Sequence, residues 1–396
     1  MTFEVPEHIR PLRDQVYEFI TELVEPAEDE LHAGDAASRA KLAELQAEAK
    51  RRGLWALGHP KDIGGGGLPF LDYVYINEVQ GRSEYGQLAL GTWTLQDSIM
   101  LNLHASPRWR EKYLAPMVSG EISPSFAMTE PGIAGSDPTG LQTSAVLDGD
   151  EWVINGRKWF TTGAGIAAYT TVMCRTEPDA PAHSAFSMII VPTDNPGYRL
   201  VRDTPVLGME SGHYEVEYDN VRVPAENLLG ERGNGFVIAQ ERLGPGRIFH
   251  AMRWLGQAQR AFDLMCNRLT SRVAFGEPLA DKQLMQQHVF ESYTEIQASR
   301  LLTLKAAEAI DRGDQARVEI AAIKVHGARM LHNVIDRAVQ VYGAEGITDD
   351  TPLSRMYREA RFARLYDGPD EVHISTVGRR VLKEYRAGGN WEFGLR

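Results

Sequence analysis

The stretch EWVINGRKWFTT, residues 151–162, decides the fold class, because it is rich in β-branched and aromatic residues within a chain otherwise patterned for helices. The stretch HYEVEYDNVRVP, residues 213–224, alternates apolar with acidic side chains, as a half-buried strand does. Turns containing Gly, Asp, Asn and Pro separate several such short stretches. We therefore expect a middle β domain over residues 122–230, folded as an antiparallel barrel or sandwich.

Helical periodicity flanks this β region on both sides. Apolar residues recur at three- to four-residue spacing in LRDQVYEFITELVEPAEDEL, residues 12–31. Residues 301–343 predict two long amphipathic helices, separated at RGDQ, residues 312–315. We expect an N-terminal helical domain over 1–121 and a C-terminal helical domain over 231–396. This α, β, α order differs from the βαβα alternation of a doubly wound nucleotide-binding fold.

The composition limits the partners and the location of the protein. A chain of 396 residues that is 43% hydrophobic can bury a large core. Its net charge of −12 argues against nucleic acid or an acidic membrane as the main partner. The N-terminal residues are charged from the start, and no window reaches the roughly 18 consecutive apolar residues of a membrane span. We expect a cytoplasmic protein without a membrane segment.

The spacing of the cysteines argues against a redox pair, and the spacing of the histidines argues against a metal site. Cys174 and Cys266 do not form a CxxC pair, so we expect reduced thiols and an intracellular setting. The 11 histidines make no HExxH motif and no paired ligand spacing. The sequence therefore predicts no metal site.

Two segments of the β region have the composition of a ligand site. FAMTEPGIAGSDPTG, residues 126–140, passes from a strand into a Gly-rich loop, where small residues let backbone N–H groups approach a ligand. In the second segment, Asn155-Gly156 favours a turn, and a following strand would place Trp159 beside Thr161. An aromatic ring next to a hydroxyl suits a flat heteroaromatic ligand. A plain hairpin loop and an ordinary buried Trp remain the alternatives.

A third segment combines helical periodicity with a proline. GNGFVIAQERLGPGRIFHAMRWLGQAQRAFD, residues 233–263, is patterned as a helix but contains Pro245. A proline in a helix interior costs about 3 kcal/mol or more, and sites that tolerate this cost are often shaped for a ligand. Arg247 would project from the interruption. The alternative is a plain break between two helices.

The stretch YDGPDEVH, residues 366–373, places three carboxylates around a Gly-Pro pair. Pro369 fits the first position of a helix and Gly368 its N-cap. Asp370 and Glu371 then lie in the first turn, where the helix dipole favours negative charge. Asp367 has no such role. It either belongs to a plain Asp-Gly turn or projects into a cleft.

These segments in order resemble the acyl-CoA dehydrogenase family, and the resemblance covers nearly the whole chain. The motifs that carry it are AMTEPGIAGSD (127–137), INGRKWFTTG (154–163), SRVAFGEPLADKQ (271–283), QVYGAEGI (340–347) and YDGPDEVH (366–373). Within the family, the chain most resembles the subgroup that has the motifs RLGPGR and DGPDEVH. The resemblance implies a helical domain, a β domain and a C-terminal four-helix bundle, assembled as a homodimer or homotetramer.

The resemblance implies FAD as the cofactor, between the β domain and the C-terminal helices. Thr161 would lie near flavin N5, and Arg272 and Gln283 would meet FAD across a subunit interface. Ala344 replaces a glycine that is usual in the family and would crowd the adenosine end. The residues implied at FAD are Phe126, Met128, Thr129, Gly135, Ser136, Trp159, Phe160, Thr161, Arg272, Gln283, Gln340, Val341, Gly343, Ala344, Pro369, Asp370 and Glu371.

The resemblance also implies the reaction. Asp367 falls where most of the family has a catalytic glutamate. A minority of the family has its base on the Pro245 helix, at a position occupied here by Gly246, which cannot act as a base. Asp367 would remove the α-proton of an acyl-CoA while hydride leaves for flavin N5, giving a 2,3-enoyl-CoA. Arg247 would orient it, and the residues implied at the substrate are Ser136, Arg247, Tyr366 and Gly368.

Two other functions remain open at this point. A flavin oxidase of the same fold would act on an acyl-CoA or on a nitroalkane, and nitroalkane oxidases also use an aspartate. A catalytically silent binding subunit is the other alternative, which the presence of Asp367 and Arg247 disfavours. The dehydrogenase reading implies an electron-transfer flavoprotein as the electron acceptor.

Overall fold

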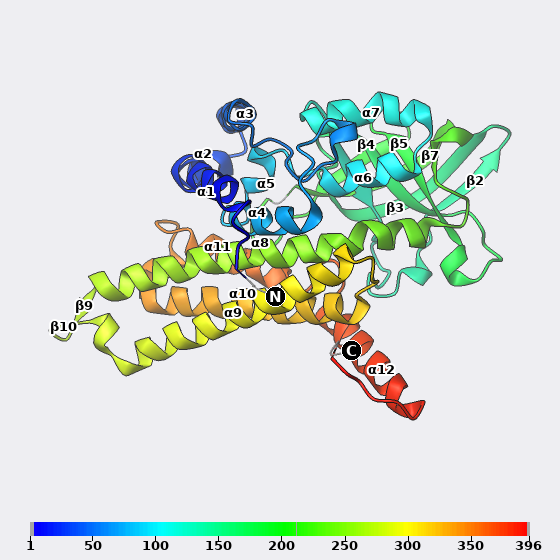
Figure 1. Cartoon of the computed structure of the whole chain (residues 1–396). Helices are drawn as coiled ribbons and strands as arrows, with labels where there is room; N and C mark the ends of the chain where they lie inside the picture. The colour runs from blue at the N-terminus through cyan, green and yellow to red at the C-terminus, as the bar shows by residue number, and fades with distance from the viewer. Residues whose placement is uncertain (1–3, 211, 394–396) are drawn as a thin grey trace. The chain divides into compact units, whose positions relative to one another are not determined.

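A computed structural model describes residues 4–210 and 212–393, and the expected order of helices, sheet and helices is confirmed (Figure 1). Contacts divide the chain into two compact units. The first contains the described residues of Met1–Gly53, Pro69–Leu90 and Gly244–Arg396, and the second contains Leu54–Leu68 and Gly91–Leu243. The predicted three-domain division at residues 121 and 230 stays a prediction.

The second unit is built on an eight-stranded sheet in the order β6-β7-β3-β2-β4-β5-β8, with β1 beside β4. The strands are β1 (Ser123–Ala127), β2 (Ser144–Asp148), β3 (Glu151–Thr162), β4 (Ala167–Arg175), β5 (Phe186–Pro192), β6 (Tyr198–Asp203), β7 (His213–Pro224) and β8 (Leu228–Leu229). Most pairs are antiparallel, as expected, but β1 and β2 both pair with β4 in parallel. The sheet is therefore mixed rather than wholly antiparallel.

Both faces of the central strands are buried, which explains their continuous apolar runs. On one face, Tyr169 of β4 joins a core with α6 (Leu95–His104) and α7 (Pro107–Ser119), where its ring lies 4.4 Å from that of Tyr113. On the other face, Val172 packs with residues of β3, β5 and β7. Successive side chains of a strand alternate between faces, so one apolar strand contributes to two cores.

The first unit is helical. Its helices are α1 (Arg10–Phe19), α2 (Glu28–His32), α3 (Ala36–Arg51), α4 (Phe70–Gln80), α5 (Gly86–Ala89), most of α8 (Gly235–Ser271), α9 (Gln283–Asp311), α10 (Arg317–Tyr342), α11 (Leu353–Phe362) and α12 (Asp370–Arg386). The predicted separation of two long helices at residues 312–315 is confirmed by the gap between α9 and α10. No helix in the described part of the chain has the length and apolarity to cross a membrane, and the cytoplasmic location stays a prediction.

Helix α8 follows the predicted helical pattern through Pro245, so the alternative of a plain break between two helices is wrong. Two glycines let it approach α4 backbone to backbone. A Cβ atom at Gly256 would collide with the carbonyl of Glu78, and one at Gly81 would collide with the backbone of Arg253. Asn77 also donates to the carbonyl of Phe249, at 2.7 Å. The middle of α8 is therefore held in one position by α4.

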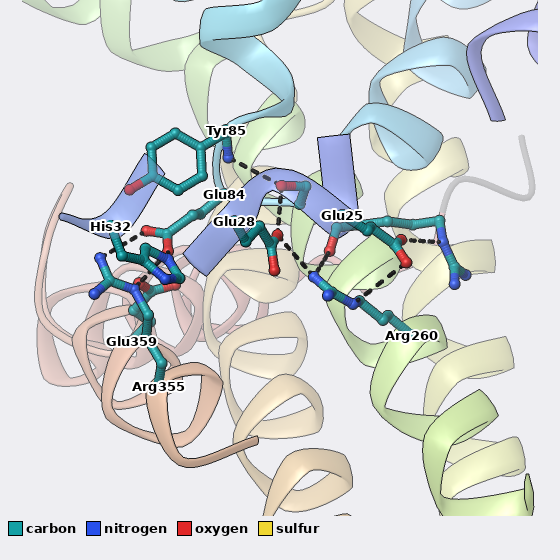
Figure 2. A network of polar contacts seen from close by, with 10 residues as sticks. Glu25, Glu28, His32, Glu84, Tyr85, Arg260, Arg355 and Glu359 are labelled. Carbon is teal, nitrogen blue, oxygen red and sulfur yellow. Dashed lines mark hydrogen bonds and ion pairs between the residues drawn. The ribbon is translucent and has the colours of Figure 1, made fainter. Parts of the chain in front are cut away.

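A network of charged side chains connects the N-terminal helices of this unit to α8 and α11 (Figure 2). Arg260 of α8 donates to Glu28 of α2 at 2.8 Å and lies 3.6 Å from Glu25. Arg82 reaches Glu25 from the segment after α4, at 3.0 Å. Ser83 donates to Glu28 at 2.5 Å. These pairs are largely buried, so each charge depends on its partner.

The other half of the network contains two glutamates that share a proton. Glu84 accepts hydrogen bonds from His32 and from Arg355 of α11 (Figure 2). Burial would raise the pKa of Glu84, but hydrogen bonds from His32, Glu359 and Arg355 lower that pKa to about 2. Burial and the charge of Glu84 raise the pKa of Glu359 well above its ordinary value. The proton of this pair is therefore favoured on Glu359, which donates a hydrogen bond to the Glu84 carboxylate.

This pair makes stability depend on pH in a defined direction. Above the ordinary glutamate pKa, folding must supply a proton to Glu359, so its contribution to stability falls as pH rises towards its folded pKa. Glu359→Gln keeps a donor without needing that proton. We expect this variant to gain stability relative to the unaltered protein between about pH 5.5 and about pH 8, by at most roughly 1.4 kcal/mol per pH unit. Urea unfolding at several pH values measures the effect.

The control is Glu84→Gln, which deprives His32 and Arg355 of their carboxylate. It should destabilise the protein by about 1–3 kcal/mol at both ends of that pH range. A stability difference between Glu359→Gln and the unaltered protein that is constant over the range would contradict the shared proton.

Candidate active site

The turn between α11 and α12 presents Asp367 in an unusual backbone conformation. Asp367 has φ 53° and Gly368 has φ 99°, and both angles lie in the left-handed region. A Cβ at Gly368 would lie 2.7 Å from Nε2 of His373, so this position requires glycine. A left-handed conformation costs a non-glycine residue about 1–2 kcal/mol. The turn therefore persists only because surrounding groups hold it.

Three side chains hold this turn by its main-chain oxygens. Lys324 of α10 is fully buried, and its Nζ donates to the carbonyls of Ala363, at 2.6 Å, and Gly368, at 3.1 Å. Nε of Arg247 donates to the carbonyl of Asp367 at 3.1 Å, and Nε2 of His373 lies 3.1 Å from the same oxygen. Arg247 therefore positions Asp367 through its backbone.

The electrostatics of this turn follow from burial. Burial lowers the pKa of Lys324 to about 8, although Asp367 and Asp370 oppose the shift. The ammonium also lies over the rings of Trp254, at 5.5 Å, and Tyr366, at 5.4 Å, where cation–π attraction favours its charge. At neutral pH, Lys324 is therefore mostly charged, although it is buried.

The carboxylate of Asp367 is partly accessible. Its side chain is 23% exposed, and Oδ2 lies 3.2 Å from Nε2 of His250 on α8. The neighbouring Tyr366 accepts a hydrogen bond from Nε1 of Trp254 at 2.8 Å, and burial raises the pKa of its hydroxyl. A carboxylate on a fixed turn, with a partly open side chain, is suited to remove a proton from a bound ligand.

The start of α12 is shifted by one residue from the prediction. Pro369 is the N-cap and Asp370 the first helical residue, so the assignment of Gly368 as N-cap is wrong. Asp370 is 2% exposed, and its Oδ2 lies 2.9 Å from Nε of Arg364 and 3.2 Å from Nε of Arg329. Glu371 is exposed. Asp370 therefore stabilises the turn through its ion pairs with Arg364 and Arg329, in addition to lying at the N-terminus of α12.

In the second unit, a buried ion pair anchors the predicted Gly-rich loop. Lys158 is fully buried, and its Nζ lies 2.8 Å from Oε1 of Glu130 and donates to the carbonyl of Met128 at 2.8 Å. The Glu130 carboxylate also accepts from the backbone N–H groups of Gln142, at 2.7 Å, and Thr143, at 2.8 Å. Sequence reasoning missed Lys158. The signal was its even spacing from Trp152, which places it on a buried face.

Strand β3 continues through Asn155-Gly156, so the predicted turn there is wrong. The register against β7 shifts once at this dipeptide, between Ile154 and Gly156, and again further along, between Lys158 and Thr161. The second shift is the bulge nearest the predicted ligand residues. Phe160, in that bulge, has φ 51° and is 40% exposed. Beyond the bulge, Thr161 is fully buried, and its hydroxyl has no hydrogen-bond partner among the described residues. An orphaned hydroxyl next to two aromatic residues fits a heteroaromatic ligand such as flavin.

Further predicted cofactor residues of this unit lie at the end of β1 and in the Gly-rich loop that follows it. The N–H of Trp159 donates to the carbonyl of Thr129 at 3.1 Å, which joins β3 to the Gly-rich loop. Phe126 and Met128 are half-buried, and the Phe126 ring lies 4.5 Å from the guanidinium of Arg242. In the loop itself, Gly135 and Ser136 are exposed.

The predicted cofactor residues of the C-terminal region lie in two connected segments. Arg272 and Gln283 are exposed on either side of a hairpin formed by β9 (Val273–Ala274) and β10 (Glu277–Pro278). Arg268, in the last turn of α8, bonds to Glu345 at 2.6 Å and covers the ring of Tyr342. That contact connects the end of α8 to the segment that contains Gln340, Val341, Gly343 and Ala344.

Comparison with known proteins identifies three consecutive domain models along the chain. They are the acyl-CoA dehydrogenase N-terminal domain over residues 6–121, the middle domain over 125–221 and the C-terminal domain over 233–382. The chain is 44% identical to the probable acyl-CoA dehydrogenase FadE2 of Mycobacterium tuberculosis over 403 residues, which covers 98% of both chains.

A vertebrate relative and a solved structure extend this comparison. The chain is 40% identical to acyl-CoA dehydrogenase family member 10 of Mus musculus, with 95% of the chain covering only 37% of that longer protein. A putative acyl-CoA dehydrogenase structure from Mycobacterium abscessus superimposes with a TM-score of 0.92 at 36% identity. The match covers 96% of this chain and 100% of that one.

The buried pair that anchors the Gly-rich loop gives a stability prediction. Lys158→Met leaves the Glu130 carboxylate buried without its cation, so we expect the free energy of unfolding to fall by about 3–5 kcal/mol. The double variant Lys158→Met/Glu130→Gln removes both charges and should recover part of that loss. Urea unfolding of the three proteins measures both values. A single variant as stable as the unaltered protein would show that the pair does not anchor the loop.

Proposed function

The chain belongs to the acyl-CoA dehydrogenase family, and from that premise we propose that it oxidises an acyl-CoA thioester to the 2,3-enoyl-CoA with Asp367 as the general base. It is an oxidoreductase that acts on CH–CH groups. The observation that carries the proposal is the placement of Asp367, partly exposed on a left-handed turn that Lys324, Arg247 and His373 hold.

In this proposal, Asp367 removes the α-proton of the acyl group. Its backbone is fixed, so its side chain needs little reorganisation to reach the bound thioester. Arg247 is bonded to the main-chain carbonyl of Asp367. Its positive charge favours the ionised form of the Asp367 carboxylate. We place Tyr366 and Gly368 beside the acyl chain and Ser136 beside the thioester.

The same proposal assigns FAD as the cofactor, and when bound it supplies the acceptor for the hydride that leaves the β-carbon. The buried hydroxyl of Thr161 would bond to the flavin, and Trp159 and Phe160 would flank it. The remaining residues proposed to hold FAD are Phe126, Met128, Thr129, Gly135, Ser136, Arg272, Gln283, Gln340, Val341, Gly343, Ala344, Pro369, Asp370 and Glu371.

We further propose a homodimer or homotetramer and an electron-transfer flavoprotein as the electron acceptor. Apolar side chains on the surface of the first unit support self-association. Phe275, at the tip of the β9–β10 hairpin, is 99% exposed, and Leu284 and Phe290 of α9 are also exposed. An apolar surface of this kind commonly marks a protein interface. Arg272 and Gln283 flank the same hairpin, as residues that act across a subunit interface would.

The central test is Asp367→Asn. We expect this variant to bind FAD normally but to lose flavin bleaching in an anaerobic titration with a panel of acyl-CoAs. The rate should fall by about 10³-fold, because general-base catalysis contributes roughly that factor. The matched control is Asp367→Glu, which keeps a carboxylate and should keep bleaching.

Undiminished bleaching by Asp367→Asn would contradict the assignment of the base. If the unaltered protein bleaches with no acyl-CoA, the dehydrogenase proposal fails. Rapid consumption of oxygen by the reduced flavin would instead identify an oxidase.

A second variant tests the cofactor assignment separately from activity. Thr161→Val keeps the side-chain volume but removes a hydroxyl that has no protein partner, so the apoprotein should be as stable as before or more stable. FAD affinity should fall roughly fivefold to tenfold, the effect of one hydrogen bond. The control is Thr171→Val in β4, another buried hydroxyl without a partner among the described residues, which should leave FAD affinity unchanged. Fluorescence titration gives both affinities, and equal affinity of Thr161→Val and the unaltered protein would contradict the contact.

A further inference from the structure

The structure assigns a positioning role to His250, which aims the carboxylate of Asp367, and to Arg253, which sets the tautomer of His250. This inference rests on the proposed function, because it concerns the base of that reaction. No sequence motif pointed to His250. It follows Arg247 by three residues on α8 and therefore lies on the same side of that helix.

The tautomer follows from hydrogen-bond chemistry. Nη2 of Arg253 lies 2.8 Å from Nδ1 of His250. A guanidinium has donors only, so Nδ1 of His250 must be the acceptor. In a neutral imidazole the proton is then on Nε2, which lies 3.2 Å from Oδ2 of Asp367. His250 therefore donates to the carboxylate.

Aromatic contacts fix the direction of this donor. The imidazole ring lies 4.9 Å from the ring of Tyr366 and 6.0 Å from that of Trp254, and those two residues are joined by a hydrogen bond. Arg253 itself is held where α8 packs against Gly81, the residue that follows α4. A continuous series of contacts therefore leads from the end of α4 through Arg253 and His250 to Asp367.

The imidazole acts as a neutral donor rather than as a second positive charge. Burial and the neighbouring Arg253 lower the pKa of His250 to about 4. Charge near Asp367 comes instead from Arg247 and Arg253 of α8 and Lys324 of α10. The other titratable groups that face this turn are Tyr366, Asp370 and His373 of its own segment and Tyr73 of α4. A neutral donor favours the ionised carboxylate without competing for the proton.

The test isolates proton removal from hydride transfer. The probe is 3,3-dimethylbutanoyl-CoA, whose α-carbon carries hydrogen and whose β-carbon carries none. With the FAD-loaded protein in heavy water, mass spectrometry measures exchange of the α-hydrogen for deuterium over a range of pH. Exchange requires an ionised base, so the acid limb of the profile reports the pKa of Asp367 in the complex.

Three variants separate positioning from packing. His250→Phe keeps the ring contacts but has no donor, and it should slow exchange roughly tenfold and move the acid limb about one pH unit upward. His250→Gln places an amide donor near the position of Nε2 and should stay within about threefold of the unaltered protein, with its acid limb unmoved. Arg253→Met removes the donor that fixes the tautomer of His250. It should move the acid limb of the exchange profile upward by less than His250→Phe does.

Each other outcome has a defined meaning. Equal exchange by folded His250→Phe and the unaltered protein would overturn the inference, and so would equal losses in His250→Phe and His250→Gln with an unmoved acid limb. If His250→Phe fails to bind FAD, folded Arg253→Met decides, and an unchanged profile there overturns the inference. Exchange that is absent in Asp367→Asn but present in the unaltered protein keeps the proposed function, whatever the His250 variants do. No exchange by the unaltered protein overturns both.

Discussion

The buried ammonium of Lys324 is the constraint on which the candidate active site depends. The turn before α12 contains two left-handed residues, and its carbonyls are directed into the protein rather than along a helix or strand. A buried carbonyl without a donor costs about as much as a lost hydrogen bond, so such a turn needs donors from elsewhere. Lys324 supplies two of them from α10. The carboxylate of Asp367 is partly exposed because the main chain behind it is held.

The supporting side chains around this turn come from helices distant in sequence. Arg247 and Asp367 are 120 positions apart, and Lys324 lies between them in the chain. α8 is in turn fixed against α4 by Gly81 and Gly256, and against the N-terminal helices by the charged network of Figure 2. The N-terminal helices therefore contribute to the site indirectly, by limiting how α8 can move.

Sequence patterns predicted the α, β, α order and the separation of α9 from α10, because hydrophobic periodicity is a local property. Two local predictions, and the alternative of a break at Pro245, failed where tertiary contacts outweigh local preference. β3 passes through Asn155-Gly156 because it pairs with β7 on both sides of that dipeptide, and α8 passes through Pro245. The N-cap before α12 moved by one residue, to Pro369. Propensity alone does not resolve such positions.

The residues missed altogether share one property. Lys158, Lys324 and His250 are each a single polar side chain in an ordinary strand or helix, and each contacts a group that lies 28 or more positions away in the sequence. Strand spacing can place a lysine such as Lys158 on a buried face, but the group that it pairs with cannot be found from that local pattern. Asp367 could be singled out because Gly368 and Pro369 mark a local turn, and only the family resemblance gave it a chemical role.

A crystal structure with FAD and an acyl-CoA analogue that cannot be oxidised tests the central claim most directly. The account predicts that a carboxylate oxygen of Asp367 lies about 3–3.5 Å from the α-carbon of the acyl group, the separation expected before proton transfer. It also predicts that Lys324 still holds the turn. A map in which the Asp367 side chain faces bulk solvent, with the acyl chain bound elsewhere, would contradict the account.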